Sequence, residues 1–284
     1  MQLVISSVIA LIVLLSGRTA IAAQQPTEAD SARRMQPRIM LWSWQKIEDL
    51  RDLDTNKAGV ALLAGRFTVD QNKIALEPRL AQLQLPSGCY KEAVVRVEVK
   101  QLPSEKDLDQ VSAQLAQSIV DLALAHGRVD GLQIDYDAKQ LERAFYIKLL
   151  KHLRQQLPAD LTLSMTALAS WSQGDQWLRQ SIAREHLPVD YVVPMFFTMG
   201  VGKDQAVNLL QDNLPGSFNG NRSIGFSLGE ASTISLISSK LKQLDRIYLF
   251  CSPGWRLDRI NTAGKLIGQS LVNQNSVKEQ KNGI

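Results

Sequence analysis

Short apolar runs rich in Val, Ile and Leu recur along the whole chain and limit what it can fold into. Several of them lack the polar alternation of a half-exposed strand, as expected of parallel strands that are covered on both faces. Stretches with helical periodicity lie between most of them. Strands that alternate with helices indicate βαβ units and a parallel sheet. The runs are residues 38–44, 59–66, 93–99, 131–137, 161–168, 191–197, 223–228 and 246–251.

The helical stretches are clearest after the third and fourth runs. Residues 107–125 carry one apolar stripe, and Ser104 with Asp107 three residues later forms a capping-box start. The next helix is marked by apolar residues at fourfold spacing and ends near Pro158. The two stripes consist of Leu108, Val111, Leu115, Ile119 and Leu122, and of Leu141, Phe145, Leu149 and Leu153.

The number of runs predicts a single (β/α)8 barrel of the TIM type, which is an α/β fold. Chains of about 250 residues commonly fold as one such barrel. The connection at 67–78 (FTVDQNKIALEP) reads as strand, polar turn and strand, so we expect a hairpin insertion after the second strand in place of an outer helix. The alternative is a doubly wound open sheet, but that fold uses a phosphate-binding turn that this sequence lacks.

The amino-terminal segment resembles a signal peptide. Residues 1–15 are almost wholly apolar, and Ala20-Ile21-Ala22 offers a cleavage site. The segment is short for a membrane span and has no Lys or Arg before its apolar core, so an uncleaved anchor is the alternative. We therefore expect a signal peptide at 1–22, a linker at 23–37, the barrel at 38–272 and a flexible tail at 273–284. This layout predicts a periplasmic or secreted protein.

Charge and motif content exclude several classes of partner. The 32 basic and 28 acidic residues are interspersed and give a formal charge of +4, without the basic block of a nucleic-acid-binding protein. No later segment is long and apolar enough to span a membrane. There is no Gly-rich phosphate loop, and the three histidines lack metal-ligand spacing. We expect a monomer with no cofactor, no metal, no nucleic acid and no membrane contact after signal cleavage.

The two cysteines are predicted to remain unbonded to each other. Cys89 precedes the third strand, whereas Cys251 ends the eighth, at the opposite end of the barrel. A five-residue strand spans about 17 Å, but the two Cα atoms of a disulfide lie within about 7 Å.

The fourth run carries the most informative polar pattern. In a strand, alternate residues share a face, so Gln133, Asp135 and Asp137 point one way and the apolar residues between them point the other. The apolar set must face the helices, and the polar set therefore points into the barrel near its C-terminal end. Catalytic residues of such barrels lie at the C-terminal ends of strands. The alternative is an ion-pair or hydrogen-bond network that only closes the barrel. A D-x-D pair also occurs in nucleotide-sugar transferases, but an export signal argues against a cytoplasmic donor.

This segment resembles the fourth-strand signature of glycoside hydrolase family 18, the chitinase-like barrels, which reads DGxDxDxE. Asp130, Gly131 and Asp135 match it, whereas Gln133 replaces an Asp and Asp137 replaces the Glu acid. PMFFT at 194–198 resembles the M-x-Y-D of the sixth strand, and Trp255 falls where the family has a sugar-site tryptophan. More closely, LQIDYDA, SMTALASW and VPMFFTMG resemble a bacterial family of unknown function that is regarded as a divergent relative of these hydrolases.

The departures from the signature bear on the chemistry that the resemblance implies. Phe197 has no hydroxyl where the family has Tyr, and Thr198 has no charge where it has Asp. The Asp137 carboxyl is retracted by one C–C bond, about 1.5 Å, relative to Glu. The acetamido-assisted chitinase reaction is therefore not intact. Either two carboxylates act directly, or the barrel binds sugar without cutting it.

The predicted catalytic residues are Asp137 as the acid, Asp135 as a deeper ionised group and Glu98 as a further carboxylate. Glu230, just past the seventh strand, is expected to cap the following helix instead. Aromatic side chains offer apolar faces to pyranose rings. The expected substrate-binding residues are Gln133, Trp255, Trp42, Trp44, Trp171, Phe197 and Arg66, the last through a pairing with Asp135 or Glu98. The predicted function is an exported glycoside hydrolase-like barrel that acts on a polysaccharide or glycan; the alternative is a non-catalytic carbohydrate-binding or scaffold barrel.

Overall fold

Eight parallel strands close into a barrel in the computed structural model, which describes residues 35–125, 127–173, 177–178, 180–181, 187–197, 218, 220–236 and 238–273. Closure is direct, because β1 pairs with β11 on one side and with β3 on the other. In chain order the barrel strands are β1 (Ile39–Ser43), β3 (Ala58–Asp70), β6 (Lys91–Gln101), β7 (Gly131–Asp135), β8 (Thr162–Leu168), β9 (Tyr191–Met195), β10 (Ser223–Ser227) and β11 (Arg246–Phe250).

These strands correspond to the eight apolar runs of the sequence, so the predicted barrel is confirmed. Each strand buries both faces: one lines the barrel interior and the other packs under the outer layer. The described outer layer contains α2 (Leu108–Ala125), η1 (Gln140–Glu142), α3 (Arg143–Gln156), α4 (Ala169–Gln173), η3 (Leu228–Glu230), α7 (Ala231–Leu236), η4 (Ser238–Gln243) and α8 (Leu257–Ile267).

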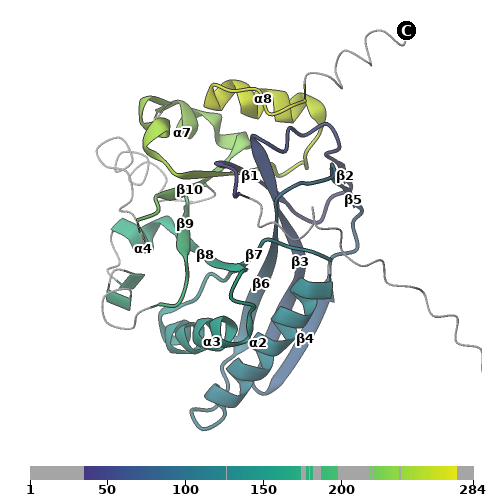
Figure 1. The fold of residues 1–284 in the computed structure, drawn as a ribbon. Helices are drawn as coiled ribbons and strands as arrows, with labels where there is room; N and C mark the ends of the chain where they lie inside the picture. Colours follow the sequence, from purple (N-terminus) through teal and green to yellow (C-terminus); the bar gives the residue numbers. More distant parts are fainter. Residues whose placement is uncertain are drawn as a thin grey trace, which may run out of the picture. The chain divides into compact units, whose positions relative to one another are not determined.

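The first two connections carry strands instead of helices. β3 continues well past the barrel and turns into β4 (Lys73–Pro78), which pairs with it in antiparallel fashion and confirms the predicted hairpin. β6 continues beside β3, so the three strands form an extension beyond the C-terminal end of the barrel, with α2 alongside (Figure 1). The short strands β2 (Glu48–Asp49) and β5 (Leu83–Gln84) pair outside the barrel.

Two helix predictions need adjustment. The first helix begins at Leu108, one residue after the predicted start, and the Ser104 hydroxyl donates to Asp107 Oδ2 at 2.6 Å. Leu141, expected on the apolar stripe of the next helix, lies in the 3-10 turn η1 and is 85% exposed. The helix α3 itself begins only at Arg143, after Glu142 has capped the turn by accepting from the Lys139 backbone N–H.

Several predictions fall on residues outside the described ranges: the leader at 1–22, most of the linker, most of the tail and Thr198. Both cysteines are buried and are not joined to each other, as predicted from their places at opposite ends of the barrel. None of the helices in the described part of the chain is long and apolar enough to cross a membrane.

Candidate active site

The site lies at the C-terminal end of the barrel, which we call the mouth. Polar side chains from β6, β7 and β8 meet there. Inside β7, Gln133 is fully buried and bridges the barrel: Trp42 Nε1 donates to its Oε1 at 2.7 Å, and its Nε2 donates to Ser164 Oγ at 3.2 Å. These contacts place Gln133 beneath the mouth of the barrel. Trp42 is 3% exposed, so its ring supports the site floor from below.

Asp135 lies one pleat above Gln133 and is held on both carboxylate oxygens. Arg96 Nη1 donates to Oδ2 at 2.7 Å, and Thr166 Oγ1 donates to Oδ1 at 2.8 Å. Only 2% of Asp135 is exposed. A buried carboxylate is tolerated when it is hydrogen-bonded and paired with a cation, and both conditions are met here. Asp135 is therefore a fixed, oriented anion.

Asp137 follows two residues later, just past the end of β7, and its side chain is 42% exposed. Its Oδ2 lies 3.5 Å from Arg96 Nη2. Burial by the surrounding rim and the neighbouring charge of Asp135 raise the pKa of Asp137, while Arg96 opposes that rise. A solvent-accessible carboxyl with a raised pKa is suited to donate a proton.

Arg96 is the centre of this group of charges. Besides its contacts to Asp135 and Asp137, its Nε donates to Glu98 Oε1 at 3.0 Å. Burial alone lowers the pKa of Arg96, but the charges of the carboxylates and the hydrogen bonds to them outweigh it and raise that pKa. One guanidinium thus contacts three carboxylates, a geometry that its planar set of five donors allows.

The remaining charged residues stand on the extension. Glu98 is half-exposed on β6 and also lies 3.6 Å from Arg66 Nε. Arg66, whose expected partner was Asp135 or Glu98, pairs with Glu98 and with Glu77 on β4 at 3.9 Å. The contribution of Glu77 was not predicted, because it depends on the antiparallel register that places Glu77 opposite Arg66.

The opposite side of the mouth is aromatic. Phe197 stacks on Phe250 with ring centroids 5.6 Å apart, and Trp44 meets the edge of Phe250 at 6.1 Å. All three rings are partly exposed, whereas Trp42 contacts Phe197 from below. Phe250, at the end of β11, completes this group of three aromatic rings. It was not predicted from the sequence, because no polar motif adjoins it.

Besides Gln133 and Trp42, two more of the predicted sugar contacts are buried. Trp171 is 3% exposed and packs edge-on against Trp177 in the layer outside the barrel. Trp255 is 1% exposed; its Nε1 donates to the Trp42 backbone carbonyl at 2.8 Å, and its backbone N–H donates to Glu48. Neither ring presents a face on which a sugar could stack, because both are covered by core side chains on the outer side of the barrel.

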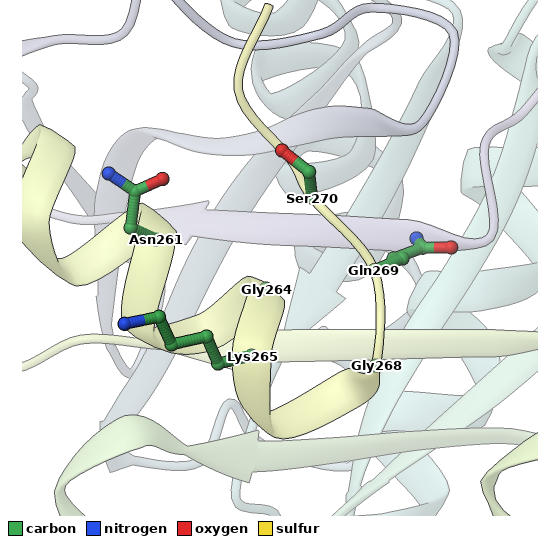
Figure 2. A pocket seen from close by; sticks show the side chains of 6 residues that line it. All are labelled: Asn261, Gly264, Lys265, Gly268, Gln269 and Ser270. Atoms are coloured by element: carbon green, nitrogen blue, oxygen red, sulfur yellow. The ribbon is translucent and has the colours of Figure 1, made fainter. Parts of the chain in front are cut away.

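One described cavity lies on the outer layer, away from the carboxylates. A pocket at the far end of α8 from the mouth is lined by helix-end backbone and a few polar side chains, which do not converge on one point (Figure 2). Its lining residues are Asn261, Gly264, Lys265, Gly268, Gln269 and Ser270. Within the described ranges, no group of three or more His, Cys, Asp or Glu side chains is arranged to hold a metal ion.

Comparisons with known proteins agree with the fold. Residues 88–187, which hold β6, β7 and the carboxylates, match the family model described as Domain of unknown function (DUF3142). The chain is similar to a solved Streptomyces coelicolor protein described as a candidate Chitinase A, with a TM-score of 0.54, 14% identity, and 83% of this chain and 97% of that chain covered. The barrel shares its fold with that protein.

Two further solved structures are similar at a lower level. One is the Bacillus cereus spore cortex-lytic enzyme SleL, with a TM-score of 0.42, 14% identity, and 68% of this chain and 51% of that chain covered. The other is an endo-β-N-acetylglucosaminidase from Cordyceps militaris, with a TM-score of 0.40, 11% identity, and 84% and 87% covered. None of the curated proteins matches the sequence.

Proposed function

We propose that this protein is an exported glycoside hydrolase that cleaves a glycan at the C-terminal mouth of its barrel. The proposal rests on the division of the mouth into an aromatic half and a half with carboxyl groups. One half presents partly exposed aromatic rings, and the other presents a solvent-accessible carboxyl above a buried, oriented one. Sugars need both, because their C–H faces pack on aromatic rings and their hydroxyls and glycosidic oxygen need polar partners.

In this proposal Asp137 is the general acid. It is exposed enough to reach a glycosidic oxygen, and its raised pKa keeps a larger fraction of it protonated than an ordinary Asp would have. Asp135, fixed by Arg96 and Thr166, supplies a negative charge under the positive charge that develops on the sugar ring. Glu98 is the remaining candidate for a second reacting carboxylate.

The fold neighbour described as a candidate Chitinase A supports a glycan substrate at this end of the barrel. Phe197 at a rim position argues for a sugar whose cleavage does not depend on an acetamido group, since its ring has no hydroxyl with which to orient one. Gln133 is already engaged by Trp42 and Ser164, which gives it a positioning role below the sugar.

A second candidate, a non-catalytic glycan-binding barrel, is favoured by one observation. Asp135, Asp137 and Glu98 all contact the same guanidinium, so the arrangement also suits a static ion-pair network. A screen of the mature protein against a panel of polysaccharides, with reducing ends as the readout, separates the two. Turnover that is lost in Asp137→Asn supports the hydrolase. Binding without turnover for every polysaccharide would reject it in favour of the binding barrel.

A further inference from the structure

The extension made by β3, β4 and β6 has two chemically different faces. The outer face is apolar: Phe67, Val69 and Val97 are buried and pack with α2 in one core cluster. The inner face carries Arg66, Thr68, Glu77 and Glu98, all half-buried or exposed. We refer to these four side chains as the wall.

The direction of the wall follows from strand register. Arg66 pairs with Arg96 across β3 and β6, and Thr68 pairs with Glu98, so these side chains share a face. Arg96 is on that face and contacts Asp135 inside the barrel. Glu77, opposite Arg66 on β4, joins the same face. The wall is therefore the continuation of the polar side of the mouth, carried upward beyond Asp137.

The wall leaves polar atoms accessible to a ligand. Arg66 lies 3.6 Å from Glu98 and 3.9 Å from Glu77, beyond hydrogen-bond distance from either. The Arg66 side chain is 39% exposed and the Glu77 side chain is 70% exposed. Strands rise about 3.3 Å per residue, so Thr68 and Glu98 stand roughly 7 Å above the level of Arg66 and Arg96.

We infer that the wall is a second sugar-binding subsite, which holds a neutral sugar residue of the same glycan next to the residue bound in the mouth. This inference rests on the proposed function and deepens it. Carboxylates accept from sugar hydroxyls, the guanidinium donates to them, and the Thr68 hydroxyl can do either. A polyanionic glycan fits less well, because two carboxylates and one guanidinium leave the wall with net negative charge.

The subsite makes a prediction about chain length. A disaccharide that occupies the mouth alone does not reach the wall, whereas a longer oligosaccharide does. Loss of a wall contact should therefore weaken long substrates selectively. A hydrogen bond to a charged group corresponds to about a tenfold change in affinity or more.

The test compares oligomers of two to six units, of β-1,4-linked glucose and of N-acetylglucosamine, labelled at the reducing end. Wild type, Arg66→Gln, Thr68→Val and Glu77→Gln are measured for kcat/KM, and for Kd where no cleavage occurs. Arg51→Gln is the matched control for an exposed, ion-paired arginine, and Glu105→Gln is the control for an exposed glutamate. Thermal midpoints check that each variant is folded.

In Arg66→Gln and Glu77→Gln the expected loss of kcat/KM or affinity is about tenfold for six-unit oligomers and less than twofold for two-unit oligomers. In Thr68→Val, which removes a neutral hydroxyl, the loss for six-unit oligomers should be roughly twofold to tenfold. The controls should show no change. Equal losses at both lengths, or none at six units while wild type still cleaves or binds, would overturn the wall subsite and leave the proposed function standing. If wild type neither cleaves nor binds any oligomer or polysaccharide tested, the proposed function fails and the subsite fails with it.

Discussion

Asp135 and Asp137 lie two residues apart and contact the same guanidinium, but their surroundings give them different chemistry. Asp135 is buried and hydrogen-bonded on both oxygens, whereas the Asp137 side chain is 42% exposed and has one long contact to Arg96. Two carboxyl groups whose environments differ in this way are able to divide the roles of acid and anion.

We expect Asp137→Asn to remove most hydrolytic activity, by about a hundredfold or more, because it removes the proposed proton donor. Its free energy of unfolding should stay within about 0.5 kcal/mol of wild type, since an exposed rim side chain contributes little packing. Asp135→Asn should lower both activity and stability, the latter by about 1–3 kcal/mol through the weakened bond to Arg96. Paired measurements of turnover and chemical denaturation check this. An Asp137→Asn variant with full turnover would transfer the acid role to Glu98.

The second prediction concerns Arg96 as a positioning residue. Arg96 holds down the pKa of Asp137, so its removal should raise that pKa. A general acid must be protonated, and activity at high pH is lost as the acid ionises. In Arg96→Met the alkaline limb of the kcat profile should therefore move to higher pH, and Arg96→Lys should restore it most of the way because the charge returns. The charged groups facing Arg96 are Asp135, Asp137 and Glu98. If the alkaline limb of the kcat profile of Arg96→Met stays at the wild-type pH, Asp137 is not the acid.

Strand alternation was sufficient to predict from sequence which residues of the fourth strand share a face, because burial of the apolar set fixes the other set. It could not predict the partner of each carboxylate. Arg96 contacts Asp135 because β6 and β7 are adjacent with those two residues in register, and register is a property of the assembled sheet. Burial of Trp255 was missed for a similar reason: its indole reaches the Trp42 carbonyl from a loop whose path the sequence does not specify.

At the scale of elements, the hairpin was predictable and its consequence was not. The segment 67–78 has apolar positions at alternate residues around a polar turn, which identifies two strands. That β6 lengthens to match β3, so that a polar face stands beside the mouth, depends on long-range pairing. The end of the hairpin is also tied to the barrel by Arg79, whose side chain is 4% exposed.

Arg79 joins the loops that border the mouth, and we expect its removal to be costly. Its guanidinium donates to the carbonyls of Ser43 and Trp44, and of Lys46 at 2.8 Å, and lies 3.9 Å from the buried Glu48. Arg79→Met removes these donors, although the Trp44 carbonyl keeps a partner, the Lys46 backbone N–H. The change should lower the free energy of unfolding by about 3 kcal/mol. Chemical denaturation measures it, with Arg51→Met as a control that should leave the midpoint unchanged. If the free energy of unfolding of Arg79→Met falls no further than that of the control variant, water replaces the guanidinium at these carbonyls.

At the scale of the whole barrel, the end opposite the mouth is closed by a buried polar cluster. Glu92 is fully buried and accepts from Tyr191 and, at 2.7 Å, from Tyr248; Gln36 adds a further bond at 2.9 Å. These residues come from β6, β9, β11 and the segment before β1. The sequence predicted neither the cluster nor the burial of Glu92, since an isolated Glu at a strand start is more commonly exposed.

The last prediction is that Glu92 makes the barrel less stable as pH rises. Burial raises the pKa of Glu92 above its value in the unfolded chain, although the two tyrosine hydrogen bonds oppose the rise. With a raised folded pKa, the folded state binds the proton more tightly. The stability gained in this way is fully present below the unfolded pKa and is lost as pH rises through the folded one.

Glu92→Gln stays neutral, can accept from one tyrosine and donate to the other, and carries no such penalty. The free energy of unfolding of Glu92→Gln relative to wild type should therefore increase with pH above about 4.5. Urea denaturation of both proteins from pH 4 to pH 8 measures this difference in the free energy of unfolding. As a control, the same pH dependence should be found when both proteins also carry Asp137→Asn, because the Asp137 carboxyl lies at the other end of the barrel. A difference that stays constant with pH would mean that Glu92 titrates alike in the folded and unfolded chains.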